Sequence, residues 1–201
     1  MNRYDQSSWN NPQQKETRSC YDIFKEINDH QVTALMVHDQ MADIFWFMQL
    51  KGFACMHEYQ FLCESIGHRK TKKHYLCEHG KLLPDGELKN PEILPVDWLK
   101  YSKNDVTNQV RLQYIEKTLA TYKTWEQETK EMYEKAICDL MANGSVCDAK
   151  FVYCLLEDVS EELKELEALC AKLRMHDDML SGALGVQHWL HKKYKKKLEE
   201  L

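Results

Sequence analysis

Hydrophobic residues recur along most of the chain at steps of three, four and seven, which is the spacing of amphipathic helices. In the first helical stretch this spacing places on one face Ile23, Ile27, Ala34, Val37, Met41, Ile44, Phe45 and Met48. Comparable stripes predict five helices, over residues 19–50, 53–78, 104–142, 146–175 and 179–201. Short turns are expected at Lys51-Gly52 and at Asn143-Gly144, where Gly144 suits a left-handed helix cap. Ser145 and Asp148 then resemble a capping box for the next helix.

The connection between the second and third predicted helices is long and rich in proline. Residues 79–103 contain Pro84, Pro91 and Pro95, which exclude a long helix there. Such a connection is explained if it spans the length of a bundle, so that the second and third helices run parallel. The sequence therefore predicts an all-α fold, a four-helix bundle with a long crossover between helices 2 and 3 and a short C-terminal fifth helix.

The polar residues divide the chain into three parts. Residues 1–18 are rich in Asn, Gln and Ser without a period, which predicts a flexible polar arm. Residues 19–176 form the bundle, and residues 177–201 form a C-terminal helix with a Lys-rich end.

Composition and charge bear on membrane association, secretion and nucleic-acid binding. No apolar run approaches the ~18 residues of a membrane span, and the N-terminus lacks the apolar segment of a secretory signal. The eight cysteines include no C-x-x-C pair and are interpreted as reduced thiols. We therefore predict a cytoplasmic protein with no membrane association. The net charge of −5 disfavours a general nucleic-acid-binding surface.

The turn between the first two helices resembles that of the mini-ferritin (Dps) family. Phe45-Trp46 and then Met56-His57-Glu58 stand where the family has His-Trp and Leu-His-Glu, with the same separation between Trp and His but with Gly52 displaced by two positions. Residues 79–84 (HGKLLP) and 151–167 (FVYCLLEDVSEELKELE) resemble the start of the family's crossover and the fourth helix of ferritins. The resemblance implies a ferritin-like fold, iron as the metal and an oligomeric assembly.

Most of the family's iron ligands are replaced in this sequence. The resemblance places ligands at a His before the Trp, at the His of Leu-His-Glu and at acidic residues farther along the second helix. Phe45 occupies the first position, Phe61 the first acidic position, and Lys72 and Leu76 the later ones. Only His57 remains, and no Glu-x-x-His motif occurs. We assign no residue a catalytic role.

A residual metal site is predicted on the second helix, where His57, Glu64 and His68 share one face. Imidazole and carboxylate groups suit iron, zinc or manganese. Glu64 and His68 are one turn apart and could share an ion, whereas His57 and Glu64 are separated by roughly 10 Å of helical rise. The alternative is a polar face that contacts solvent or a partner subunit. A zinc site at His74, Cys77 and His79 lacks a second ligand pair and is disfavoured.

Two surfaces are predicted to contact partners. Phe45, Trp46 and Phe61 are expected to form a homo-oligomer interface, because a monomer rarely exposes such an apolar patch. The lysines of the C-terminal end resemble the tails by which some mini-ferritins bind DNA through counterion release. They are Lys192, Lys193, Lys195, Lys196 and Lys197. The alternative for these lysines is a solvated helix end.

Three functional hypotheses follow. The first is an oligomeric binding or structural protein, ferritin-like and Dps-like, with a degenerate metal centre. The second is an active mini-ferritin that oxidises and stores iron at a site built from His57, Glu64, His68 and acids on the neighbouring helices. The third is a shell that associates with DNA through its Lys-rich tail and has no catalytic activity.

Overall fold

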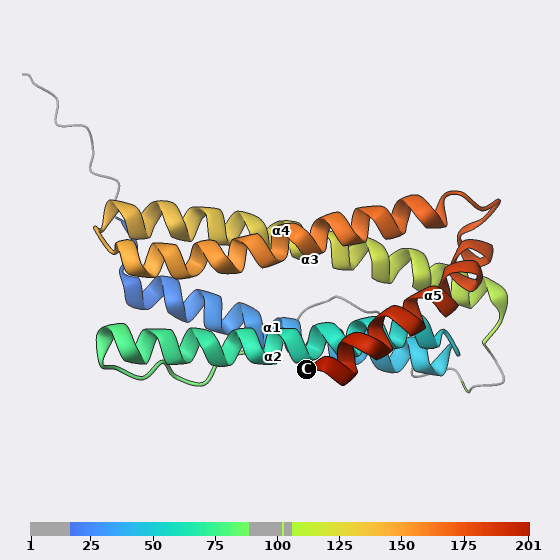
Figure 1. Cartoon of the computed structure of the whole chain (residues 1–201), viewed down its shortest axis with the longest axis horizontal. Helices are drawn as coiled ribbons and strands as arrows, with labels where there is room; N and C mark the ends of the chain where they lie inside the picture. Colours follow the sequence, from blue (N-terminus) through green and yellow to red (C-terminus); the bar gives the residue numbers. More distant parts are fainter. Residues whose placement is uncertain (1–16, 89–101, 103–105) are drawn as a thin grey trace, which may run out of the picture.

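The computed structural model describes residues 17–88, 102 and 106–201, and this part of the chain is folded into five α-helices (Figure 1). Their bounds are α1 Cys20–Phe47, α2 Lys51–His79, α3 Asn108–Ala142, α4 Val146–Leu173 and α5 Met179–Glu200. The predicted all-α class is confirmed, and the helix bounds differ from the predicted ones by a few residues. The predicted polar arm falls almost wholly outside the described residues, as does the later part of the predicted crossover.

The turn between α1 and α2 lies earlier than predicted. α1 ends at Phe47, and Gln49 in the turn has a positive φ of 64°. Gly52, which was expected to break the helix, lies inside α2. A Cβ atom at Gly52 would overlap the backbone carbonyl of Gln187 in α5. The glycine is therefore needed for the close approach of α5, and the prediction of a turn at Lys51-Gly52 is wrong.

The turn between α3 and α4 agrees with the sequence in one respect and differs in another. Gly144 has a φ of 74°, which is the left-handed conformation predicted for it. The predicted capping box is wrong, because the side chain of Ser145 makes no cap hydrogen bond. The carboxylate of Asp148 instead accepts hydrogen bonds from His74 and His79 of α2, at 2.9 and 3.1 Å.

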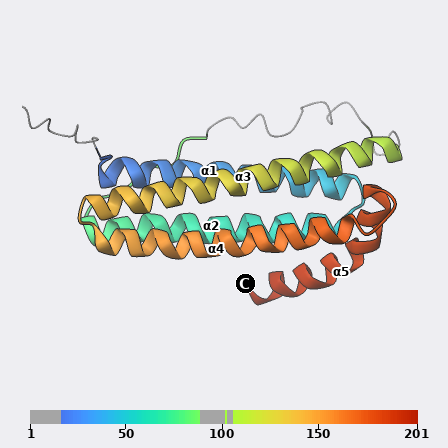
Figure 2. The ribbon, with the colours of Figure 1, turned by 90° about the horizontal axis from the view of Figure 1, so that it is seen from above.

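The four long helices form two antiparallel pairs, α1 with α2 and α3 with α4 (Figures 1 and 2). Across the pairs α1 lies beside α3 and α2 beside α4, and α2 and α3 run in the same direction along the molecule. After α2 the chain turns back along α1. There Asn28 Nδ2 donates to the carbonyl of Pro84 (3.1 Å), and Asp29 Oδ1 accepts from the backbone of Glu87 (2.9 Å).

The interior has an apolar core at each end. The first apolar core lies at the α1–α2 turn and includes Met41, Phe45, Phe53, Ile115 and Leu173. The second apolar core lies at the α3–α4 turn and includes Ile23, Phe24, Tyr133, Leu140 and Val152. Between them is a polar layer, which we define by Gln31, His38, His57, Gln60, Glu64, Glu126 and Glu162.

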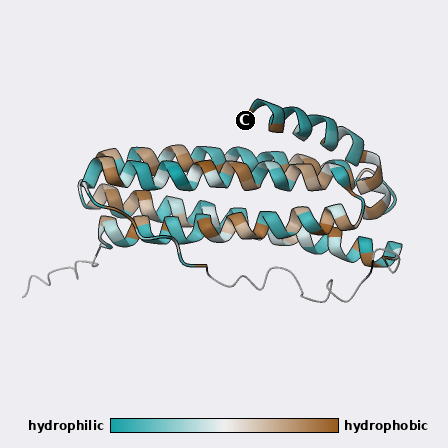
Figure 3. Cartoon of the chain, turned by 90° about the horizontal axis from the view of Figure 1, so that it is seen from below, coloured by the Kyte–Doolittle hydropathy of each residue, from teal (hydrophilic) through white to brown (hydrophobic). Residues whose placement is uncertain are grey.

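α5 packs onto the outside of the first apolar core. Its residues Ala183, Val186, Leu190 and Tyr194 are buried there, whereas its last turns are hydrophilic (Figure 3). Among the described residues, no helix is long and apolar enough to cross a membrane.

Candidate functional site

A pair of buried histidines joins α1 to α2 within the polar layer. His38 and His57 are 1% and 0% exposed, and their Nδ1 atoms are 3.0 Å apart. Burial lowers the pKa of His38 to about 3. The pKa of His57 is also lowered, by burial and then by the neighbouring His38. Both rings are therefore neutral at pH 7, one Nδ1 donating to the other. Neither Nε2 atom has a hydrogen-bond partner within the described part of the chain.

Aromatic rings enclose this pair. The His57 ring stacks on Phe45, with centroids 5.4 Å apart and planes at 4°, and meets Tyr122 edge-on. Phe45 also stacks on Phe53 and is 0% exposed. The prediction that Phe45 lies at an oligomer interface is therefore wrong, because its ring fills the chain's own core. The Tyr122 hydroxyl accepts a hydrogen bond of 2.6 Å from Gln60 Nε2.

Glu126 of α3 faces the histidine pair without bonding to it. It is 1% exposed, and its Oε1 lies 4.0 Å from His38 Nε2, beyond hydrogen-bond distance. Burial, followed by repulsion from Glu162 and Glu64, raises the pKa of Glu126 well above its ordinary value. The raised pKa favours the protonated, uncharged form of Glu126, in keeping with the neutral histidines.

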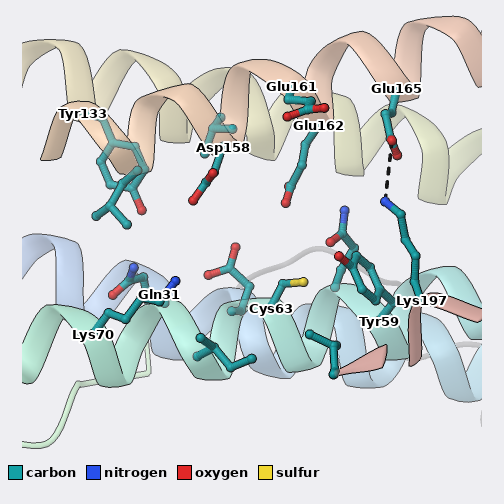
Figure 4. Close-up of a pocket in the computed structure, with 17 residues that line it drawn as sticks. Gln31, Tyr59, Cys63, Lys70, Tyr133, Asp158, Glu161, Glu162, Glu165 and Lys197 are labelled. Atoms are coloured by element: carbon teal, nitrogen blue, oxygen red, sulfur yellow. Dashed lines mark ion pairs between the residues drawn. The ribbon is translucent and has the colours of Figure 1, made fainter. Parts of the chain in front are cut away.

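A cleft of about 340 Å³ opens beside the polar layer, between α2 and α4 (Figure 4). We call it the acidic cleft. On the α4 side its carboxylates recur at steps of three and four residues, so they share one helix face. They belong to Asp158, Glu161, Glu162 and Glu165. The α2 side contributes Tyr59, Gln60, Cys63, Glu64, Gly67 and Lys70. Gln31 of α1 and Tyr133 of α3, both buried, also line the cleft.

The carboxylates of the acidic cleft differ in their charge partners. Burial raises the pKa of the half-buried Glu64 to about 7. The pKa of Glu162 is raised to about 8, by burial and then by repulsion from Glu64 and Asp158. For Glu165 burial alone would raise the pKa. The hydrogen bond from Lys193 (2.9 Å) and the charge of Lys197 (3.6 Å) outweigh it and lower the pKa overall.

The structure does not bring the three predicted metal ligands together. His57 lies in the aromatic surroundings of the histidine pair, and Glu64 lines the acidic cleft. His68 is half-buried, and its pKa is lowered by burial and then by Lys72, with Asp85 acting in the opposite direction. In the described residues no group of three or more His, Cys, Asp or Glu side chains is arranged to hold a metal ion.

The predicted partner surfaces are only partly exposed. Trp46 is 40% exposed and donates a hydrogen bond of 2.6 Å to Glu58, while Phe61 is half-buried, so an interface at these two residues stays a prediction. Of the five tail lysines, Lys193 and Lys197 are bound to Glu165 of α4. Lys196 pairs with Glu200 of its own helix at 3.6 Å. The exposed lysines of the tail are Lys192, Lys195 and Lys196.

Sequence reasoning assigned no site role to several residues of the polar layer. His38, Gln31 and Glu126 fall within the apolar stripes of α1 and α3, at positions where a hydrophobic residue was expected. Glu162 likewise lies three residues after Val159 and four before Leu166, both of which are buried. A polar residue on the register of an apolar stripe is the signal that could have found these residues.

The chain was compared with known proteins, and no family model and no curated protein matches it.

Proposed function

We propose that the chain is a ferritin-like, Dps-like four-helix bundle with a degenerate metal centre, acting as an oligomeric binding protein. One observation carries the proposal. Polar and titratable side chains from all four long helices meet in a layer midway between two apolar cores, which is where bundles of this kind build their sites. The antiparallel pairs and the common direction of α2 and α3 support the same architecture.

The chemistry of the layer favours binding over iron oxidation. Di-iron bundles use a Glu from each of two helices and a Glu-x-x-His from each of the other two. Here α1 contributes His38 and no carboxylate to the layer, and the Nδ1 atom of His57 is occupied by His38. Phe45, which stacks on the His57 imidazole, stands where the resemblance expects a metal-binding His. The polar layer therefore lacks the set of Glu and His ligands that di-iron bundles use.

The second candidate is an active mini-ferritin. The observation that favours it is the mutual repulsion of Glu64, Glu126 and Glu162, which come from three helices and would be relieved by a divalent cation. DNA association through the tail is less supported, since Lys193 and Lys197 are engaged with Glu165.

The test combines an iron-oxidation assay with mass measurement. We expect the purified chain to oxidise Fe(II) in air no faster than buffer does, and to form an oligomer that dissociates in Trp46→Ala. Glu64→Gln serves as the variant for the competing candidate. Accelerated oxidation that disappears in Glu64→Gln would establish the mini-ferritin instead.

A further inference from the structure

We propose that the acidic cleft between α2 and α4 binds an extended aliphatic polyamine, with its ammonium groups on the carboxylates and buried amide oxygens and its methylene chain on the aromatic and aliphatic walls. The inference deepens the proposed function and rests on it, because it names the ligand class of a binding protein.

Two buried amide oxygens of the cleft can accept a hydrogen bond from a ligand. Gln31 and Gln60 both line the cleft and are 2% and 5% exposed, yet neither Oε1 atom has a partner within the described residues. The amide nitrogen of Gln60 is already committed to Tyr122. A carbonyl oxygen only accepts, so the missing partner is a group with N–H or O–H bonds. Protonated amines supply several such donors.

The charge of the cleft is unbalanced toward the negative. Glu165 is already matched by Lys193 and Lys197. The acids left over are Glu64, Asp158, Glu161 and Glu162, against Lys70 as the remaining ammonium group of the lining. In the part of the chain that the structure describes, no ion pair joins Glu64 or Glu162 to a cation.

The arrangement of these acids suits a long ligand better than a metal ion. Residues 158 to 165 of α4 extend over about 10 Å of helical rise, so their carboxylates form a row. Metal binding needs ligands that converge on one point, and no such group of three is found among the described residues. A chain with charges at intervals can satisfy a row of carboxylates. The cleft volume of about 340 Å³ lies in the range of small-ligand sites.

The protein's own Lys197 shows that the walls accept an alkylammonium group. Its side chain enters one end of the cleft from α5, and its ammonium nitrogen lies 4.8 Å from the centre of the Tyr59 ring and 3.6 Å from Glu165 (Figure 4). Farther along, Tyr133 and Leu155 offer an aromatic and an aliphatic surface of the same kind. Aromatic faces attract cations and pack on methylene groups.

Binding of a cation should release protons from the cleft. Glu64 and Glu162 have pKa values of about 7 and about 8, so both are partly protonated near neutral pH. A bound cation favours their ionised forms, and affinity should therefore rise with pH. The other titratable groups that face them come from four helices: Tyr59, Cys63 and Lys70 of α2, Tyr122, Glu126 and Tyr133 of α3, Asp158, Glu161 and Glu165 of α4, and Tyr194 and Lys197 of α5.

The experiment is calorimetric titration of the full chain with spermidine at pH 6.5 and 8.5 in low salt. We expect one site per chain, bound about tenfold or more tightly at the higher pH. Glu162→Gln should weaken binding at pH 8.5 by about tenfold, as the loss of one charge-assisted contact does. The matched control is Glu167→Gln, which removes an exposed charge on α4 outside the cleft and should leave affinity unchanged. Thermal unfolding of both variants verifies that they fold.

Three outcomes would overturn the inference. The first is no binding at pH 8.5. The second is equal weakening by Glu162→Gln and Glu167→Gln, which would show general charge attraction. The third is binding of Mg²⁺ or Mn²⁺ that displaces spermidine and is lost in Glu162→Gln, which would make the cleft an inorganic cation site. The iron-oxidation assay is independent of all three, so a chain that neither oxidises iron nor binds spermidine refutes only this inference.

Discussion

Two groups of histidines in this molecule contain similar residues but differ in how completely they are hydrogen-bonded. At the α3–α4 turn, His74 and His79 share the carboxylate of Asp148, at 2.9 and 3.1 Å, and His74 stacks on Phe151. In the polar layer, His38 and His57 bond to each other, and the carboxyl of Glu126 remains 4.0 Å away. The first group is satisfied within the chain, whereas the second leaves buried acceptors and donors unmatched. Similar side chains therefore form a fully hydrogen-bonded cluster in one place and a buried, incompletely hydrogen-bonded one in the other.

The largest effect is expected from breaking the satisfied group. Asp148→Ala leaves two imidazole N–H groups without their acceptor, and we expect the free energy of unfolding to fall by about 2–4 kcal/mol. Urea unfolding measures this loss. Asp148→Asn keeps one acceptor oxygen and should lose about half as much. Equal losses in the two variants would show that the hydrogen bonds from His74 and His79 to Asp148 do not stabilise the fold.

A smaller effect is expected from the unsatisfied pair. His57→Phe removes the partner of the His38 Nδ1 atom and should cost about 1–3 kcal/mol, because one buried nitrogen is left unpaired. Adding His38→Leu removes that nitrogen as well, so the double variant should recover most of the loss. A double-mutant cycle from urea unfolding gives the coupling. Additive losses would show that the two rings do not depend on each other.

The carboxyls of the acidic cleft should make the free energy of unfolding depend on pH. Glu64 and Glu162 have folded-state pKa values raised from 4.5 to about 7 and about 8. Between pH 4.5 and about 8 these two carboxyls bind more protons in the folded chain than in the unfolded chain, so their contribution to the free energy of unfolding falls as the pH rises.

Glu162→Gln removes part of that slope. It should be about 1–2 kcal/mol more stable than the original chain at pH 8.5 and equal to it at pH 4, as followed by thermal unfolding across the range. Identical pH profiles for the two chains would mean that Glu162 is not held in its protonated form.

The smallest effect is expected at Glu165, which has a lysine partner, unlike Glu162 on the same helix face. Lys193→Ala removes the hydrogen bond to Glu165 and should cost about 0.5–1 kcal/mol, as a partly exposed ion pair does. Lys192→Ala, an exposed neighbour, should change the free energy of unfolding by less than about 0.5 kcal/mol. If the two variants are equal in urea unfolding, Lys193 does not stabilise α5 on α4.

The sequence predicted the helices because their apolar stripes are long and regular, but it could not predict what depends on packing between helices. Gly52 was interpreted as a helix breaker, and its actual role became visible only with α5 against it. Ser145 and Asp148 have the spacing of a capping box, yet two histidines from α2 compete for the carboxylate. The pairing of His38 with His57 depends on the register of α1 against α2, which no local pattern specifies.

The close approach at Gly52 has a consequence for the lysine at the end of the cleft. α5 is seated where only a hydrogen atom fits between Gly52 and the carbonyl of Gln187, and the same helix carries Lys197 to one end of the cleft. A side chain at Gly52 would push α5 away from α2 and move Lys197 away from the cleft. The close packing of α5 at Gly52 thus fixes where Lys197 lies, and faster proteolysis of residues 179–200 in Gly52→Val would reveal the displaced helix.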